Sequence, residues 1–345
     1  MKDNEVSMQG GGYYNENSSL QKLAIDEYLK LLTPIQCQNP SIVLADYGCS
    51  EGKNSIWLLS QYLARVHSIS SATLVFNDTP FNDFSILSTT IDASRHQLSL
   101  DGKLAINPLL SPRSHFQQVL PGGFVDAGFS FTALHWLQHM PDESSSTSTL
   151  SAAAHKDLVT FLSARYKEIR SKGTLTLCIP IRGEPSIAPS AQCLEVTVRN
   201  LYSTYKADPS IVARVPLYFR TMSEILTAVA AAEGEWHVNN HTVLSVIHPL
   251  WSPVLSETGS SANKLSACDK YADGITRMTI AAMSQVFVED LKAQARKKGS
   301  PANREFPDKT KFLEDLFCVF KEEFLRTHCQ DKVGFTYALL ELERV

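Results

Sequence analysis

The chain has 345 residues, of which 43% are hydrophobic and 20% are charged, and this is ordinary usage for a globular protein of one large domain or two. The net charge of −4 without a Lys/Arg block argues against nucleic acid as a partner, and no apolar stretch is long enough to span a membrane. The polar N-terminus and seven irregularly spaced cysteines without a zinc-type spacing predict a cytoplasmic protein with reduced thiols and no metal site.

The first part of the chain is predicted to hold a mobile segment and then a helix. Residues 1–12 are polar and end in three glycines, so we expect them to be mobile in the free protein. Asn17 or Ser18 can cap an amphipathic helix that runs to about Leu32. Gln21 lies in its first turn, where spacing alone predicts a solvated side chain.

Residues 42–55 predict a strand, a tight turn and a helix. Four apolar residues precede Asp46, Gly48 and Gly52 bracket the turn, and helical spacing follows from Asn54. This combination forms the nucleotide-binding crevice of many α/β proteins. An ordinary strand-to-helix turn that binds no ligand has the same pattern, and residues 42–55 alone do not distinguish the two.

Three ligands are candidates for such a crevice. A dinucleotide requires G-x-G-x-x-G, whereas this turn has only Gly48 and Gly52. A P-loop requires four residues between its glycines and then Lys with Ser or Thr, whereas Asn54 follows Lys53 here. S-adenosylmethionine (SAM) needs no phosphate cradle, glycine lets the backbone approach it closely, and Asp46 would face its cationic methionine end.

The second predicted strand, 73–78, also ends in an acid. An acid at this position accepts hydrogen bonds from ribose hydroxyls, so Asp78 suits the adenosine of SAM and of NAD alike. The alternative role for Asp78 is to cap the next helix. Further elements are predicted from spacing along the rest of the chain. They are strands at 104–110, 124–131 and 173–179, one or two strands within 235–246, helices at 156–171, 194–205, 222–233, 262–287 and 309–325, and loops at 144–151 and 294–308.

Loops at the carboxyl ends of the strands are expected to carry the chemistry, because that edge binds ligands in open α/β sheets. The loop 111–116 would lie beside the adenine. His135 and Trp136 follow the fourth strand, with a surface histidine and a packed aromatic as the alternative. An indole N–H donates hydrogen bonds and never accepts them.

The alternation of strands and helices with surplus helices predicts an α/β fold: a doubly wound, Rossmann-like sheet with an α-helical cap. We assign residues 1–185 and 220–250 to the core that binds the cofactor, including an N-terminal lid segment. Residues 186–219 and 251–330 form the cap, which makes the substrate pocket.

Five motifs in the same order resemble those of the SABATH methyltransferases, the family of salicylate, benzoate and jasmonate carboxyl methyltransferases and theobromine synthase. The motifs are Met8-Gln-Gly-Gly with Tyr14-x-x-Asn17-Ser18-x-x-Gln21, Asp46-Tyr-Gly-Cys-Ser-Glu-Gly-Lys-Asn54, Phe76-Asn-Asp-Thr-Pro-Phe-Asn-Asp-Phe84, residues 114–121 and residues 130–141. The resemblance covers about residues 8–250 and implies a class I methyltransferase sheet with SAM as cofactor.

The resemblance also implies roles for single residues. Its SAM-holding positions and their motif neighbours map to Tyr14, Ser18, Asp46, Gly48, Asn54, Asp78, Thr79, Ser114 and His115. Its carboxylate-holding positions map to Gln21 and Trp136, with His135 in the same pocket and Tyr218 and Phe219 in the substrate pocket. Gln21 is thus expected to donate a hydrogen bond that positions the substrate carboxylate, whereas helical spacing alone predicts a solvated side chain.

The sequence departs from the family pattern at three points. The lysine after the first glycine pair is missing, Thr79 replaces a leucine, and His115 replaces a phenylalanine. The last two change the surface of the adenine pocket. The cap matches least well, so the acceptor is not identified.

The expected function is methyl transfer from SAM to the carboxylate of a small, mostly apolar acid, giving a methyl ester and S-adenosylhomocysteine (SAH). Methylation of a ring nitrogen or a phenol is one alternative, and the paired donors Gln21 and Trp136 argue against it. A SAM-binding protein without methyl transfer is another, and the intact acids Asp46 and Asp78 argue against that. Family members are often homodimers, so a homodimer stays open.

Overall fold

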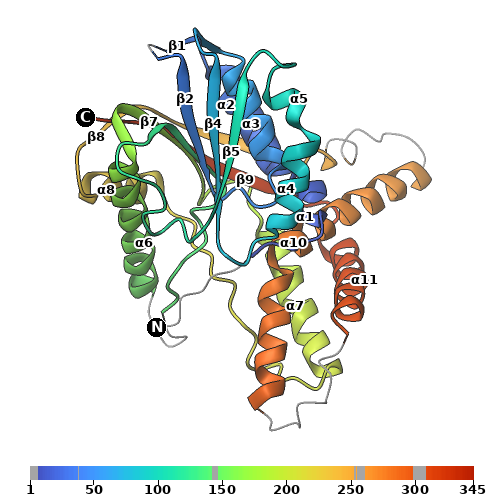
Figure 1. The fold of residues 1–345 in the computed structure, drawn as a ribbon. Coiled ribbons are helices and arrows are strands. Elements are labelled where there is room, and N and C mark those ends of the chain that lie inside the picture. The colour runs from blue at the N-terminus through green and yellow to red at the C-terminus, as the bar shows by residue number, and fades with distance from the viewer. Residues whose placement is uncertain (1–6, 38, 142–146, 252–253, 255–260, 298–307) are drawn as a thin grey trace.

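A mixed sheet of seven strands forms the centre of the computed structural model, which describes residues 7–37, 39–141, 147–251, 254, 261–297 and 308–345 (Figure 1). Its order is β5-β4-β2-β6-β7-β9-β8. The first five are parallel, and β9 runs antiparallel to both β7 and β8. The strands are β2 (Ser41–Tyr47), β4 (Ser71–Asp78), β5 (Ala105–Pro112), β6 (Val125–Phe131), β7 (Ile169–Ile181), β8 (Trp236–Ile247) and β9 (Gly334–Arg344), and β1 (Ile35–Gln36) pairs separately with β3 (Val66–His67).

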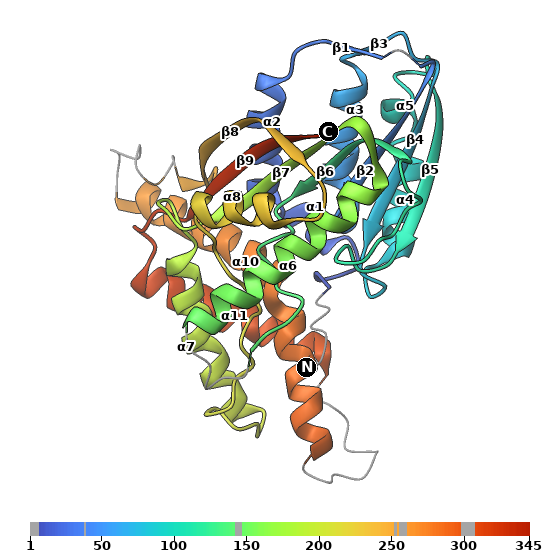
Figure 2. The same cartoon turned by 90° about the vertical axis from the view of Figure 1, so that its left-hand side faces the viewer.

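Helices cover both faces of the sheet because its strands bury side chains on both sides. Leu44 and Phe76 point to one face, whereas their neighbours Ala45 and Val75 point to the other, as the two-residue period of a strand requires. The first face carries α2 (Ser19–Leu31), α3 (Lys53–Leu63), α4 (Phe84–Ala93) and α5 (Arg95–Leu98), and the second carries α6 (Thr147–Glu168) and α8 (Met222–Ala231) (Figures 1 and 2).

A second group of helices packs together beyond one end of the strands (Figure 1). It consists of α7 (Ala188–Thr204), α10 (Ser261–Lys297) and α11 (Lys309–Thr327), which share an apolar cluster that includes Leu194, Ile275 and Phe320. The predicted doubly wound α/β fold with additional helices is therefore confirmed. The cap boundaries at 186–219 and 251–330 stay a prediction.

Most predicted elements lie within a few residues of the observed ones, and the exceptions lie at the ends of helices. The helix expected to reach 171 ends at Glu168, because β7 already begins at Ile169 and pairs with Val125. The loop expected at 144–151 is helical from Thr147, and its residues 144–146 lie outside the described part of the chain. The helix α10 extends to Lys297, into the predicted loop at 294–308.

The strand β9 was not predicted. It inserts between β7 and β8, so that Leu339 pairs with Cys178 on one side and Thr242 on the other. A strand buried on both faces lacks the alternation of apolar and polar residues that identifies half-buried strands. Among the described residues, no helix combines the length and apolar character that crossing a membrane would require.

The glycine-rich segment before α1 (Tyr13–Asn17) was expected to be mobile, yet residues 9–12 are bonded to both parts of the fold. Gln9 N donates to Ala281 O of α10 at 2.9 Å, and Gly12 N donates to Glu51 Oε1 at 2.6 Å. Glu51 is 1% exposed and also accepts from Asn15 N at 3.0 Å. Residues 8–17, which we name the strap, therefore connect α10 to the turn after β2.

Candidate active site

The carboxyl ends of β2, β4 and β6 meet where the strand order reverses, which is the usual ligand position in such sheets. The chain turns there at Gly48, whose φ of 96° is a left-handed conformation that favours glycine. A Cβ atom at Gly48 would lie 2.4 Å from Ala133 Cβ. The turn after β2 and the loop after β6 thus approach each other closely at the crevice.

Two small chambers of about 70 Å³ each lie side by side at this edge. We name them the sheet-edge chamber and the cap chamber. The sheet-edge chamber includes Gly48, Ser50, Asp78, Thr79, Asn82, Ser114 and His115. The cap chamber includes Ser18, His135, Ser190, Met278, Met283 and Tyr337. Both chambers are lined by Met8, Tyr14, Gln21, Thr132 and Trp136, which therefore form the boundary between them.

The two strand-end acids differ in their position. Asp78 lines the sheet-edge chamber and accepts from Ser50 N at 2.6 Å and Thr79 N at 2.7 Å. Asp46 is 5% exposed, accepts from Ser55 Oγ, and lines neither chamber. Burial raises the pKa of Asp78 to about 6 and, together with the Asp78 charge, the pKa of Asp46 to about 7.

Several buried polar atoms in the sheet-edge chamber have no hydrogen-bond partner among the described residues. They are Ser50 Oγ, Thr79 Oγ1 and both ring nitrogens of His115. Burial, and secondarily the Arg165 charge, lowers the pKa of His115 to about 3, so this imidazole is neutral. Native proteins rarely leave buried polar atoms unpaired, so the chamber fits a ligand that both donates and accepts hydrogen bonds.

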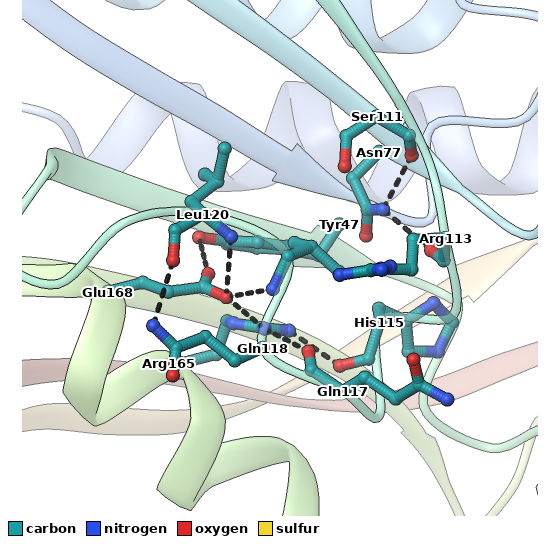
Figure 3. A network of polar contacts seen from close by, with 11 residues as sticks. Tyr47, Asn77, Ser111, Arg113, His115, Gln117, Gln118, Leu120, Arg165 and Glu168 are labelled. Atoms are coloured by element: carbon teal, nitrogen blue, oxygen red, sulfur yellow. Dashed lines mark hydrogen bonds and ion pairs between the residues drawn. The ribbon is translucent and has the colours of Figure 1, made fainter.

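A buried ion pair holds the loop that carries Ser114 and His115 (Figure 3). Arg165 donates to His115 O at 2.6 Å, to Gln117 O at 2.7 Å and to Glu168 Oε1 at 2.8 Å. Glu168 also accepts from Tyr47 OH at 2.8 Å and from two backbone N–H groups of the same loop. Because Arg165 and Glu168 are fully buried, this network fixes the loop to β2 and α6.

The amide of Gln21 is fixed in one orientation. Its Oε1 atom accepts from Asn54 Nδ2 at 2.7 Å, and its Nε2 atom donates to Phe131 O at 2.9 Å. Asn54 also donates to Ser18 Oγ at 2.9 Å. Since an amide nitrogen carries two hydrogens, Gln21 retains one donor at the boundary between the chambers. Asn54 lies behind Gln21 and lines neither chamber.

Trp136 and His135 reach the site from the loop after β6. Trp136 Nε1 has no hydrogen-bond partner among the described residues, and Trp136 lines both chambers, as Gln21 does. The His135 ring lies 5.7 Å from the Trp136 ring and 5.7 Å from the Phe219 ring. Burial, and secondarily the Arg220 charge, lowers the pKa of His135 to about 3, which leaves it uncharged.

Not every expected residue lines the site. Tyr218 was expected in the substrate pocket, but its hydroxyl donates to Glu224 at 2.7 Å and it lines neither chamber. Sequence reasoning did not find Met8 and Thr132 at the boundary, or Tyr337, whose buried hydroxyl has no partner among the described residues of the cap chamber. Thr132 has a φ of 56°, which no local sequence signal indicates, and Tyr337 belongs to the unpredicted β9.

Comparisons with known proteins agree with this geometry. Residues 3–153 match the family described as "SAM dependent carboxyl methyltransferase". Jasmonate O-methyltransferase of Arabidopsis thaliana is 24% identical over 270 residues, which cover 64% of this chain and 69% of that relative. Among solved structures, loganic acid methyltransferase with SAH covers 98% of each chain with a TM-score of 0.71 at 18% identity, so the two share a fold.

A fungal relative matches along almost its entire length. Methyltransferase FUS9 of Gibberella moniliformis is 30% identical over an alignment of 362 positions, which covers 99% of this chain and 98% of the relative. Together with the family match over residues 3–153, this similarity identifies the family of the protein. The chain belongs to the SABATH family of SAM-dependent carboxyl methyltransferases, and SAM is its cofactor.

Proposed function

We propose that this methyltransferase esterifies the carboxylate of a small, mostly apolar acid, giving a methyl ester and SAH. The observation that carries the proposal is the pair of N–H donors, Gln21 and Trp136, on the wall shared by the two chambers. A carboxylate has two oxygens that accept hydrogen bonds, so two neutral donors suit it. No charged side chain lines the cap chamber among the described residues, which suits an otherwise apolar acceptor.

The acceptor needs no general base in this proposal. A carboxylic acid with a pKa of about 4 is already ionised at neutral pH. His135 is uncharged and its Nδ1 atom has no partner among the described residues, so it shapes the pocket and offers a polar contact. The chain's own task is to hold one carboxylate oxygen towards the sheet-edge chamber and to exclude water, and such placement can supply roughly 7–11 kcal/mol of the barrier reduction.

We assign the sheet-edge chamber to SAM, which when bound supplies a methyl group already activated by its sulfonium. Asp78 would accept from the ribose hydroxyls, and Ser114, His115 and Thr79 would contact the adenosine, since they line this chamber. Tyr14 and Gly48 would contact the methionine part. Asp46 does not line the cavity, so it would act at longer range, and the positive charge of bound SAM would favour its ionised form.

The strap of residues 8–17 would act as the lid over both ligands. Its residues Met8 and Tyr14 line both chambers, and Ser18 lines the cap chamber at the start of α2. Glu51 holds the strap through Gly12 N and Asn15 N. Closing this lid would remove water from the boundary where the carboxylate and the cofactor meet.

The names of two similar proteins favour a carboxylate acceptor. Jasmonate O-methyltransferase matches 64% of this chain, and the structural neighbour with the same fold is a loganic acid methyltransferase. Both names refer to methylation of an acid.

The proposal is tested by incubating the full chain with SAM carrying a labelled methyl group and a panel of aromatic, terpenoid and aliphatic acids. A labelled product that releases its label on mild alkaline hydrolysis is the expected ester. Label that survives hydrolysis, or that appears only with phenols and ring nitrogens, would replace the carboxylate by another acceptor. SAM binding without label transfer to any acceptor would mean that the chain does not transfer methyl groups to the tested classes.

A further inference from the structure

A third cavity of about 580 Å³ lies beside the cap chamber. One face of α7 lines it through Ile187, Ala188, Ala191, Leu194 and Glu195, at the spacing of neighbouring positions on one side of a helix. The volume falls within the roughly 300–1,000 Å³ that is typical of small-molecule sites. We name this space the α7 cavity.

The α7 cavity adjoins the cap chamber. Ile187, Met283 and Phe335 line both spaces. The Phe335 ring lies 6.2 Å from the His135 ring in the cap chamber and 6.2 Å from the Phe219 ring in the α7 cavity. Because the two spaces adjoin, the body of an acceptor whose carboxylate lies in the cap chamber can extend into the α7 cavity.

The lining of the α7 cavity is mainly apolar. Its arginines differ in whether they have hydrogen-bond partners among the described residues. Arg199 donates to Glu195 at 3.0 Å and to Pro209 O at 3.0 Å, and Arg182 donates to Glu224 at 2.7 Å. Arg214 is exposed and has no ion pair or hydrogen bond with any described residue. A free guanidinium therefore stands where the cavity meets solvent.

We propose that the α7 cavity binds the body of an elongated acid, whose carboxylate lies at the boundary of the two chambers and whose distal end carries a hydrogen-bond acceptor near Arg214. The proposal rests on the proposed function for the position of the carboxylate. An apolar body gains from burial along α7, and Phe335 and Met283 guide it from one space into the other. Specificity would then lie in chain length and in the polarity of the far end.

The test uses the full chain with SAH present and measures binding of hexanoate and dodecanoate by calorimetry. We expect dodecanoate to bind more tightly. Ala191→Phe places a ring in the cavity and should weaken dodecanoate binding about tenfold, the loss expected when about two methylene groups return to water. It should leave hexanoate binding unchanged. Gln192→Phe, on the same helix but outside the cavity lining, is the matched control and should change neither.

A second comparison addresses the distal end. Dodecanedioate should bind about threefold more tightly than dodecanoate, a modest gain because the ion pair is exposed, and Arg214→Gln should remove that preference. If Ala191→Phe does not fold, Ala188→Phe, which lies on the same cavity face, replaces it.

The outcomes separate the two proposals. No binding of dodecanoate to the wild-type chain, or equal changes for both acids in Ala191→Phe, would overturn the α7 cavity as a substrate site. Esterification of hexanoate without any advantage for dodecanoate would leave the proposed function standing and refute the cavity. Length-dependent binding that Ala191→Phe abolishes, without any ester formed, would support the cavity and refute carboxyl methylation.

Discussion

Replacing Asn54 by aspartate tests whether this residue orients Gln21 or holds the cofactor. In the wild-type chain, Asn54 Nδ2 donates to Gln21 Oε1 at 2.7 Å, and Gln21 Nε2 then faces Phe131 O at 2.9 Å. A carboxylate at position 54 has no hydrogen to donate and repels Oε1. The Gln21 amide is therefore expected to turn its NH₂ group towards the new carboxylate and its oxygen towards the acceptor.

The magnitude follows from the lost contact. A hydrogen bond to a charged group contributes about 1.5–3 kcal/mol, and each 1.36 kcal/mol corresponds to a factor of about ten in rate. We expect kcat/KM for the acid to fall about 10- to 150-fold in Asn54→Asp. The Kd for SAH should change less than about threefold, because Asn54 does not line the sheet-edge chamber.

The pH dependence provides a signature that a structural defect would not produce. Position 54 is 8% exposed, so burial raises the pKa of the introduced carboxyl, and its protonated form regains a donor for Gln21. The deficit in kcat/KM should shrink as the pH falls. Initial rates of methyl transfer across pH and calorimetry with SAH measure both effects.

Asn82→Asp is the matched control for this prediction. Asn82 lines the sheet-edge chamber and donates to Ser50 O at 2.8 Å, so this variant should weaken SAH binding instead. The reasoning about Asn54 would be refuted if Asn54→Asp weakened SAH binding as much as it lowered kcat/KM, with no recovery at low pH.

Three further predictions follow from the site. Trp136→Phe keeps the ring but removes the donor, so kcat/KM should fall about 10- to 100-fold with unchanged SAH affinity by calorimetry; a loss of SAH affinity would contradict the assigned role. Because burial raises the pKa of Asp46 to about 7 and of Asp78 to about 6, the native state binds more protons than the unfolded chain between about pH 4 and 7. The unfolding free energy of the cofactor-free protein should therefore contain a contribution that decreases as the pH rises through this window. In urea titrations, the double variant Asp46→Asn/Asp78→Asn should lose this contribution. An unchanged dependence of the unfolding free energy on pH in that variant would refute the prediction. Arg165→Met leaves the buried Glu168 carboxylate without its cation and should lower the unfolding free energy by about 3–5 kcal/mol. The double variant Arg165→Met/Glu168→Leu should regain much of that free energy. A double variant as unstable as the single one would contradict a buried ion pair.

The cofactor side of the fold could be predicted from the sequence because its signals are local. The apolar run before Asp46, the glycines of the following turn and the acid at Asp78 are read within a few residues of one another. The observed β2 and α3 begin within one residue of the predicted strand and helix. The order of the motifs along the chain then indicated the family and, through it, the cofactor.

The remainder depends on contacts between distant residues. β9 pairs with strands that lie far earlier in the chain, and both of its faces are buried. Gln21 looks solvated by helical spacing, yet its amide bonds to Phe131, which is 110 residues away. The resemblance places Tyr218 in the substrate pocket, but its hydroxyl donates to Glu224 and the residue lines neither chamber.

The position of the acceptor carboxylate between the two chambers, held by Gln21 and Trp136, is central to the proposed function. It is tested most directly by a crystal structure of the full chain with SAH and an acid that the labelling assay identifies as a substrate. We predict SAH in the sheet-edge chamber and the carboxylate oxygens within hydrogen-bond distance of Gln21 Nε2 and Trp136 Nε1. A carboxylate bound elsewhere, or either side chain turned away from it, would contradict the account.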